Sequence, residues 1–255
     1  MILKEIISRL EAKFPPEAAM EWDNVGLLLG DANREIKKVL LALDITYDVV
    51  EQAVESGADL ILSHHPIMFL PVKRITPDTE LGKILLCAAE NKICIYSAHT
   101  NCDVAKNGIN ARLAEIFELK NPQPLEESGL GRIGDLEKEM DFSNFARLVC
   151  AKLDTPNVRF GGDKNRIIKR VAVGSGACAD SIPQALAMGA DVMITADVKY
   201  HEMLDAVALG INVIDAGHYP TEIIVTDIFA ELLRDCGLTL QKAKSTDVFK
   251  YVKEN

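Results

Sequence analysis

Histidine is the commonest side-chain ligand for transition metals, and this 255-residue chain contains only five. His64 and His65 follow the apolar residues 60–62 after one serine and are followed by Pro66, which favours an extended or turning backbone. Neighbouring side chains on a regular strand point to opposite faces, but in such a bend both imidazoles can face one cavity. A His-His-Pro sequence alone fits structural histidines as well as metal ligands.

Two more histidines are each followed four residues later by a carboxylate. His99 precedes Asp103, and His218 precedes Glu222. An i, i+4 spacing puts both side chains on one face if the segment is helical, and Pro220 is acceptable in a first helical turn. The same spacing also occurs in surface ion pairs. The three motifs together, each at the end of an expected strand, favour a metal site.

The candidate ligands combine imidazole and carboxylate groups and include no thiolate. They are His64, His65, Asp103, His218 and Glu222. This donor set suits zinc, iron, manganese, cobalt or nickel. Because a carboxylate can bridge, we expect two divalent ions, which at about 3.5–4 Å apart can share a hydroxide nucleophile and assist a displacement reaction. The sequence therefore predicts a metal-dependent hydrolase, and a non-catalytic metal-binding or regulatory protein is the alternative.

His99 and His201 are the candidate catalytic residues, as proton relays for such a reaction. A structural role for His99, or one in supporting the ligands, is equally compatible with its position. His201 could line the cavity or simply begin a helix.

Other motifs are weaker. Trp22, the only tryptophan, precedes a turn at Asp23-Asn24, and we interpret it as a packed residue, with a place at the cavity rim as the alternative. Gly174 and Gly176 lack the third glycine and the ribose-binding acid of a dinucleotide site, so no such cofactor is expected. The six cysteines are scattered without a CxxC pair and are predicted to be buried, reduced thiols.

The elements that position these residues alternate between strand and helix. Residues 39–43, 60–62 and 93–96 have the length and composition of buried strands, and residues 47–56 have helical character ending at Gly57. Because parallel strands of an open α/β sheet bind ligands at their carboxyl ends, the histidines are well placed. We expect an α/β fold with mixed, largely parallel sheets.

An internal repeat divides this pattern. Residues 39–65 align without a gap on residues 171–197, and the Gly-Ala-Asp at 57–59 meets the same three residues at 189–191. The second copy has Ala196-Asp197 where the first has the histidine pair, so we expect one shared site rather than two. The repeat predicts two related three-layer lobes. The first comprises residues 1–125, joined by 216–255, and the second comprises residues 126–215, with the divide at the prolines of 121–128.

Composition and charge exclude several classes of protein. A formal charge of −10 argues against a general binder of nucleic acid or anionic membranes. The first 14 residues form an amphipathic helical pattern interrupted by charges, unlike a signal peptide. No apolar run approaches the roughly 20 residues of a membrane span. We therefore expect a cytoplasmic location.

The motifs together resemble the NIF-three-like family, the GTP cyclohydrolase I type 2 homologues, in its compact form without an inserted domain. The resemblance spans nearly the whole chain and is carried by Trp22-Asp23-Asn24, Leu43-Asp44, Ser63-His64-His65-Pro66, His99-Thr100-Asn101 with Asp103, and Gly217-His218 with Thr221-Glu222. It implies a toroidal homohexamer with a dinuclear metal centre on the five candidate ligands. The family name implies a GTP cyclohydrolase activity, with attack of hydroxide on the purine C8, and a phosphoester or amide substrate fits nearly as well.

Overall fold

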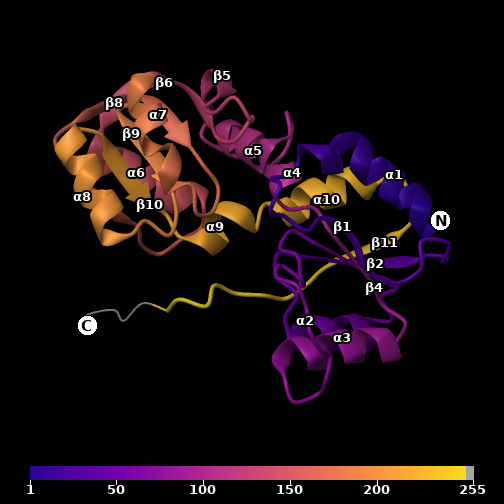
Figure 1. The fold of residues 1–255 in the computed structure, drawn as a ribbon. Coiled ribbons are helices and arrows are strands. Elements are labelled where there is room, and N and C mark those ends of the chain that lie inside the picture. Colours follow the sequence, from indigo (N-terminus) through magenta and orange to yellow (C-terminus); the bar gives the residue numbers. More distant parts are fainter. Residues whose placement is uncertain (251–255) are drawn as a thin grey trace. The chain divides into compact units, whose positions relative to one another are not determined.

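The structure is a computed structural model that describes residues 1–250, and the chain divides into two compact units (Figure 1). The first unit contains Met1–Asn101 and the chain from Val225 onward, and the second contains Cys102–Ile224. Both ends of the sequence therefore build the first unit. Within residues 1–250, no helix has the length and apolar character needed to cross a membrane.

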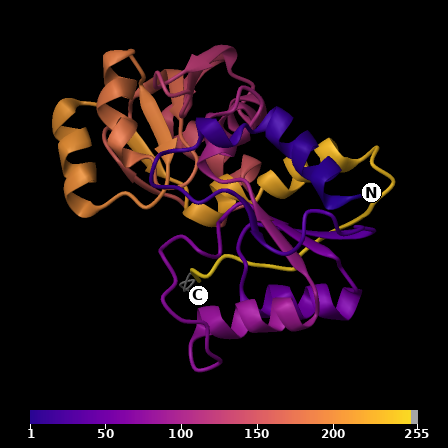
Figure 2. The same cartoon turned by 45° about the vertical axis from the view of Figure 1, so that its right-hand side comes forward.

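The first unit is a five-stranded sheet between two layers of helices. Its strands, in spatial order, are β1 (Gly26–Leu29), β4 (Cys94–Ser97), β3 (Leu60–Ser63), β2 (Lys38–Ala42) and β11 (Thr239–Lys242). Only β1 runs antiparallel to its neighbour. Helices α2 (Tyr47–Ser56) and α3 (Glu80–Glu90) cover one face, and α1 (Leu3–Lys13) and α10 (Val225–Leu233) cover the other (Figures 1 and 2).

Apolar side chains hold these layers together. Leu40, Ile61 and Ile95 of the sheet pack with Val49 of α2 and Ile84 of α3 in one buried cluster. On the other face, the rings of Phe14 and Phe229 meet edge to face with centroids 6.2 Å apart. The fully buried strand residues explain why the sequence shows apolar runs rather than an alternating pattern.

The second unit has a six-stranded mixed sheet. Its strands, in spatial order, are β5 (Lys120–Pro124), β6 (Arg132–Asp141), β8 (Ile167–Val173), β9 (Val192–Thr195), β10 (Asn212–Asp215) and β7 (Arg159–Gly161). The central strands β8, β9 and β10 are parallel, and the outer pairings are antiparallel. Helices α7 (Ile182–Ala187) and α8 (Tyr200–Leu209) pack on one face, and α5 (Ile109–Ile116) and α6 (Phe142–Lys152) contact the sheet as well.

The predicted repeat appears in the hydrogen bonds as well as in the sequence. Asp59 accepts hydrogen bonds from the backbone N–H groups of residues 37 and 38, at 2.8 and 3.1 Å. Asp191, 132 residues further on, accepts them from residues 169 and 170, at 2.9 and 2.8 Å. Each carboxylate thus binds the backbone just before a parallel pairing begins, that of β2 with β3 at Val39 and that of β8 with β9 at Val171.

The predicted elements of the first copy are confirmed almost residue by residue. Helix α2 ends at Gly57 in the left-handed conformation, at φ +67°. The pattern missed β5, because residues 120–124 contain two prolines and are exposed. Proline lacks the N–H that a central strand donates, but it is tolerated in an edge strand such as β5.

Candidate metal-binding residues in the two units

The adjacent histidines of the first unit extend from the carboxyl end of β3. The backbone N–H groups of His64 and His65 still donate to the carbonyls of Ala42 and Leu43, at 3.2 and 3.0 Å, so both residues are held beside the end of β2. Their rings nevertheless lie close together, with centroids 5.1 Å apart. His64 is fully buried, whereas the His65 side chain is 25% exposed. The predicted bend therefore brings the two imidazoles together.

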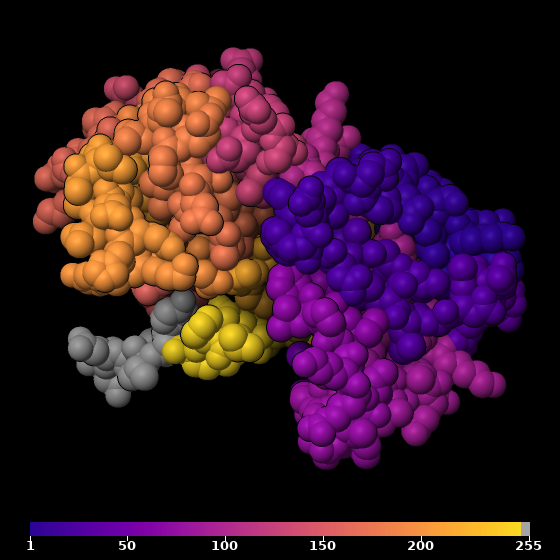
Figure 3. Space-filling model, in the orientation of Figure 1, coloured from indigo at the N-terminus to yellow at the C-terminus, as the bar shows by residue number. Residues whose placement is uncertain are grey.

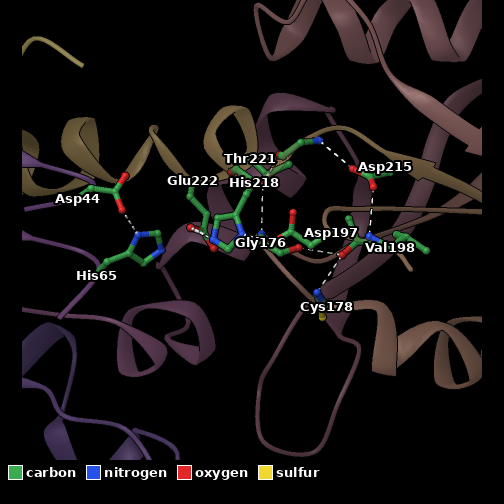
Figure 4. Close-up of polar contacts among 12 residues, drawn as sticks. Asp44, His65, Gly176, Cys178, Asp197, Val198, Asp215, His218, Thr221 and Glu222 are labelled. Atoms are coloured by element: carbon green, nitrogen blue, oxygen red, sulfur yellow. Dashed lines mark hydrogen bonds and ion pairs between the residues drawn. The ribbon is translucent and has the colours of Figure 1, made fainter. Parts of the chain in front are cut away.

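One nitrogen of each ring is fixed by an oxygen acceptor. Nδ1 of His64 lies 2.8 Å from the carbonyl oxygen of Ala98, and Nδ1 of His65 lies 2.7 Å from Oδ1 of Asp44 (Figure 4). A carbonyl and a carboxylate only accept hydrogen bonds, so Nδ1 is the donor in both rings and Nε2 carries the lone pair. Histidines that bind metals are typically held in this way.

His99 joins this pair within the first unit. Its ring centroid lies 5.0 Å from that of His64 and 5.5 Å from that of His65. One nitrogen of each of the three rings lies within 4.8 Å of the others, which is compatible with a shared ion. The structure thus places a predicted catalytic residue beside two predicted ligands.

A buried carboxylate orients His99. Nδ1 of His99 donates to Oδ1 of Asp23 at 2.9 Å, and Thr100 donates to Oδ2 through its backbone N–H and its hydroxyl, at 3.0 and 2.5 Å. Burial raises the pKa of Asp23, but the hydrogen bonds from His99 and Thr100 outweigh it and lower the pKa from 3.8 to about 2. Asp23 is therefore ionised at neutral pH and holds Nδ1 of His99 protonated.

The second unit carries its own histidine–carboxylate pair on the short helix α9 (His218–Glu222). Nε2 of His218 lies 2.8 Å from Oε2 of Glu222, while Nδ1 donates to Oδ2 of Asp197 at 2.7 Å (Figure 4). Two ligands of one zinc ion, each about 2.0–2.2 Å from it, lie ~3.4 Å apart in a tetrahedral site. The predicted i, i+4 pair is an ion pair at 2.8 Å, and its two atoms would have to separate slightly to bind one ion.

Gly176, for which the sequence predicted no role, lies against the His218–Glu222 pair. Gly176 has φ +55°, and a Cβ added there would lie 2.0 Å from Oε1 of Glu222 and 3.1 Å from Nε2 of His218. Its N–H donates to Oγ1 of Thr221 at 3.1 Å. Any larger residue at this position would have to displace the Glu222 carboxylate. Gly176 therefore shapes the candidate site.

Ser175, the residue before Gly176, positions Asp103. Asp103 lies in α4 (Thr100–Val104) and is 7% exposed. Ser175 donates from its hydroxyl to Oδ1 of Asp103 at 3.0 Å. The buried Asn110 accepts from the N–H of Ser175 at 2.8 Å and donates to the carbonyl of Asp103 at 3.1 Å. Ser175 and Gly176 thus connect Asp103 to the His218–Glu222 pair. The sequence carried no signal for Ser175 or Asn110.

His201 and Trp22 lie in more exposed positions. His201 is exposed in the first turn of α8, where its ring centroid lies 5.3 Å from that of Tyr200. The interpretation of Trp22 as a packed residue was wrong, because 59% of its surface is exposed. The turn before β1 lies at Glu21-Trp22, closed by the N–H of Asp23 on the carbonyl of Met20, and not at Asp23-Asn24 as predicted. The catalytic role of His201 stays a prediction.

Comparison with known proteins assigns the chain to a family. A family model described as Duf34/NIF3 (NGG1p interacting factor 3) matches residues 1–251. This chain belongs to the Duf34/NIF3 family. It is 40% identical over 228 residues to the "GTP cyclohydrolase 1 type 2 homolog" of Clostridium perfringens (strain 13 / Type A), covering 87% of each. It is 36% identical to the protein of the same name from Methanocaldococcus jannaschii, covering 91% of this chain and 95% of that relative.

Solved structures of the Duf34/NIF3 family share the fold. A Bacillus cereus protein related to NIF3 matches with a TM-score of 0.94 at 28% identity, covering 99% of both chains. Reduced HcgD from Methanocaldococcus jannaschii matches with a TM-score of 0.84 at 36% identity, covering 95% of this chain and 97% of that one. The family and the α/β fold predicted from the motifs are both confirmed.

Proposed function

We propose that this Duf34/NIF3 protein binds two divalent metal ions and is a metal-dependent hydrolase of a small molecule. The proposed ligands are His64, His65, Asp103, His218 and Glu222. The observation that carries the proposal is the common arrangement of the three ligand histidines. Each donates Nδ1 to a carboxylate or carbonyl oxygen, which leaves Nε2 as the nitrogen that can bind a metal.

The residues around the ligands have distinct roles in this proposal. When bound, the two ions would lower the pKa of a water molecule towards ~7 and polarise the bond to be cleaved. Asp44 and Asp197 keep the ligand rings in one tautomer and orientation. His99, whose Nδ1 is committed to Asp23, has Nε2 as its acceptor and would take the proton at that atom.

Metal binding is tested first. The full chain is stripped with a chelator and reloaded separately with zinc, iron(II), manganese, cobalt and nickel, and bound metal per chain is measured by mass spectrometry. We expect two ions in the wild type and fewer in the His64→Ala/His65→Ala and His218→Ala/Glu222→Ala variants. His201→Ala is the matched control and should keep two. Unchanged stoichiometry in both double variants would refute the ligand assignment.

Hydrolysis is tested next with the reloaded protein on a panel of nucleotides, phosphoesters and amides. The His64→Ala/His65→Ala variant measures background turnover. Turnover above that background supports the hydrolase. The relatives named GTP cyclohydrolase 1 type 2 homolog make GTP one member of the panel. No turnover of any compound above the variant would overturn the enzyme proposal.

A non-catalytic metal-binding or regulatory protein is the second candidate. The partly exposed His65 and His218 side chains, at 25% and 32%, leave room for solvent or substrate and favour the catalytic proposal, because a structural metal site is closed by protein ligands. Water exchange at a paramagnetic ion such as manganese distinguishes the two. An absence of exchangeable water would favour the second candidate.

We also propose the homohexamer that the family resemblance implies. Helix α8 lies on the outside of the second unit (Figure 3, orange at the left), and its exposed apolar side chains support an association surface. Tyr200, Leu204, Val207 and Leu209 are between 44% and 76% exposed. Native mass spectrometry should show six chains, and Leu204→Glu should lower that number if α8 takes part. A monomeric wild type would overturn this proposal.

A further inference from the structure

Two aromatic side chains of the first unit remain exposed beside the three histidines. Trp22 is 59% exposed and Phe69 is 48% exposed, although large aromatic residues are usually mostly buried. Their ring centroids lie 5.5 Å apart, edge to face. Each of these rings also lies 6.2 Å from the ring of His99. Trp22, Phe69 and His99 therefore form one continuous group of rings, which we call the aromatic cluster.

Polar contacts rather than burial fix the segments that carry the cluster. Asn24 donates from Nδ2 to the carbonyl oxygen of Met68 at 2.6 Å, which ties the segment after Trp22 to the segment before Phe69. The N–H of Asp23 donates to the carbonyl of Met20 at 2.9 Å, and its carboxylate binds His99. The rings are thus held at the surface by their backbone, and this arrangement keeps apolar area in water that a ligand could cover.

We propose that the aromatic cluster binds a planar heteroaromatic ring of the substrate by stacking. Aromatic side chains pair favourably with planar rings of many kinds, because every such ring has a π-face. The carboxylate of Asp23 is already engaged by His99 and Thr100, so it is not the group that would bind such a ligand. The ring centroid of His99 lies within 5.5 Å of those of His64 and His65, so a stacked ligand has its reacting end near the proposed ligands.

This inference rests on the proposed function for the reacting end of the ligand, but stacking itself can be measured without turnover. Trp22 is the only tryptophan in the chain, so the intrinsic tryptophan fluorescence of the full-length protein reports on this cluster alone. The metal-loaded protein is titrated with a purine, a pyrimidine and a pyridine nucleoside, and with ribose as the non-aromatic control. Free N-acetyltryptophanamide corrects for light absorbed by the ligand.

We expect a saturable change of emission with at least one of the three nucleosides and none with ribose. Phe69→Ala should weaken that binding roughly five- to a hundredfold, the fold-change that aromatic stacking typically contributes. Phe69→Tyr should restore it. The matched control is Phe160→Ala, since Phe160 is also 48% exposed but lies in β7 of the second unit. Its affinity should equal that of the wild type.

Three results would overturn the inference. The first is no saturable change with any nucleoside. The second is an equal change with ribose or with Phe69→Ala. The third is an emission that depends on protein concentration without ligand, which would show that a second copy of the chain covers the cluster. Saturable binding of a nucleoside without hydrolysis of any substrate would support the stacking inference and overturn the hydrolase proposal. Hydrolysis of a non-aromatic ester, unaffected by Phe69→Ala, would support the hydrolase proposal and overturn the stacking inference.

Discussion

Oδ1 of Asp44 accepts a hydrogen bond from Nδ1 of His65 at 2.7 Å, and 21 residues separate the two side chains. Asp197 and His218 repeat both the distance and the separation in the second unit. In each case the aspartate follows one parallel strand and the histidine follows the next, β2 and β3 in one unit and β9 and β10 in the other. The same supersecondary arrangement thus orients a candidate ligand twice.

The first prediction concerns these two aspartates. Asp44→Ala and Asp197→Ala should each weaken metal binding about 10- to 100-fold, because the ring loses the acceptor that fixes its tautomer and orientation. Competition with a fluorescent chelator measures the dissociation constant. Asp48→Ala, an exposed change on α2 of the first unit, is the control and should bind as the wild type does. Equal affinities in all four proteins would contradict the assigned role.

The second prediction concerns Gly176. Gly176→Ala should weaken metal binding and destabilise the fold, because its Cβ would displace the Glu222 carboxylate and because φ is +55°. Gly210→Ala is the matched control, since Gly210 has φ +85° but nothing lies within 4 Å of the added Cβ. Both variants should lose about 1–2 kcal/mol from the positive φ, measured by urea denaturation. Only Gly176→Ala should also lose metal affinity, and a similar loss in Gly210→Ala would argue against the steric explanation.

The third prediction uses the lowered pKa of Asp23. Its folded-state pKa of about 2 lies below the ordinary aspartate pKa of 3.8, so ionised Asp23 stabilises the fold at neutral pH, by about 2 kcal/mol. This stabilisation is complete above pH ~4 and disappears as the pH falls through about 2. Asp23→Asn should therefore be destabilised at neutral pH, and the difference from the wild type should shrink in acid. Denaturation of the metal-free proteins at several pH values checks this, and a difference that is independent of pH would contradict it.

The fourth prediction concerns the free thiols. Burial raises the pKa of Cys178 to about 11, so its reactive thiolate is scarce at pH values well below that. The prediction that all six cysteines are buried was wrong for Cys87, Cys150 and Cys236, which are partly exposed. Iodoacetamide at mildly alkaline pH should modify Cys87 and Cys236 well before Cys178, as read by peptide mass spectrometry. The denatured protein is the reference, in which all three cysteines should be modified at equal rates. Equal modification rates in the native protein as well would show that Cys178 is not protected.

The fifth prediction compares the two copies of the repeat. Asp59→Ala and Asp191→Ala should destabilise the protein by similar amounts, about 1–3 kcal/mol each, because each leaves two backbone N–H groups beside the start of a parallel pairing without their acceptor. Asp59→Asn and Asp191→Asn each keep one acceptor oxygen, so they should lower the free energy of unfolding less than the alanine variants do. Urea denaturation gives the free energies of unfolding. A loss at only one of the two positions would show that the copies are not equivalent.

Local patterns in the sequence predicted much of this structure. Apolar runs located β2, β3 and β4, and the left-handed Gly57 marked the end of α2, because these features depend on residues close in the chain. The histidine motifs and the family were found in the same way.

Relationships across long distances in the sequence were not predicted. Asp23 lies 76 residues before the His99 ring that it orients, and Gly176 lies 46 residues before the Glu222 carboxylate that it approaches. Nothing in the neighbourhood of either residue specifies its partner. The same holds for β11, whose partner β2 lies about two hundred residues earlier.

The first unit needs the final part of the chain, since α10 covers its sheet and β11 pairs with β2 from Thr239 to Lys242. The second unit needs only the continuous stretch Cys102–Ile224. During synthesis, the ribosome therefore releases every residue of the second unit before the edge of the first sheet can close. Until β11 has been synthesised, β2 would be an unpaired edge strand of the first sheet. Such an edge can form hydrogen bonds with strands of other chains.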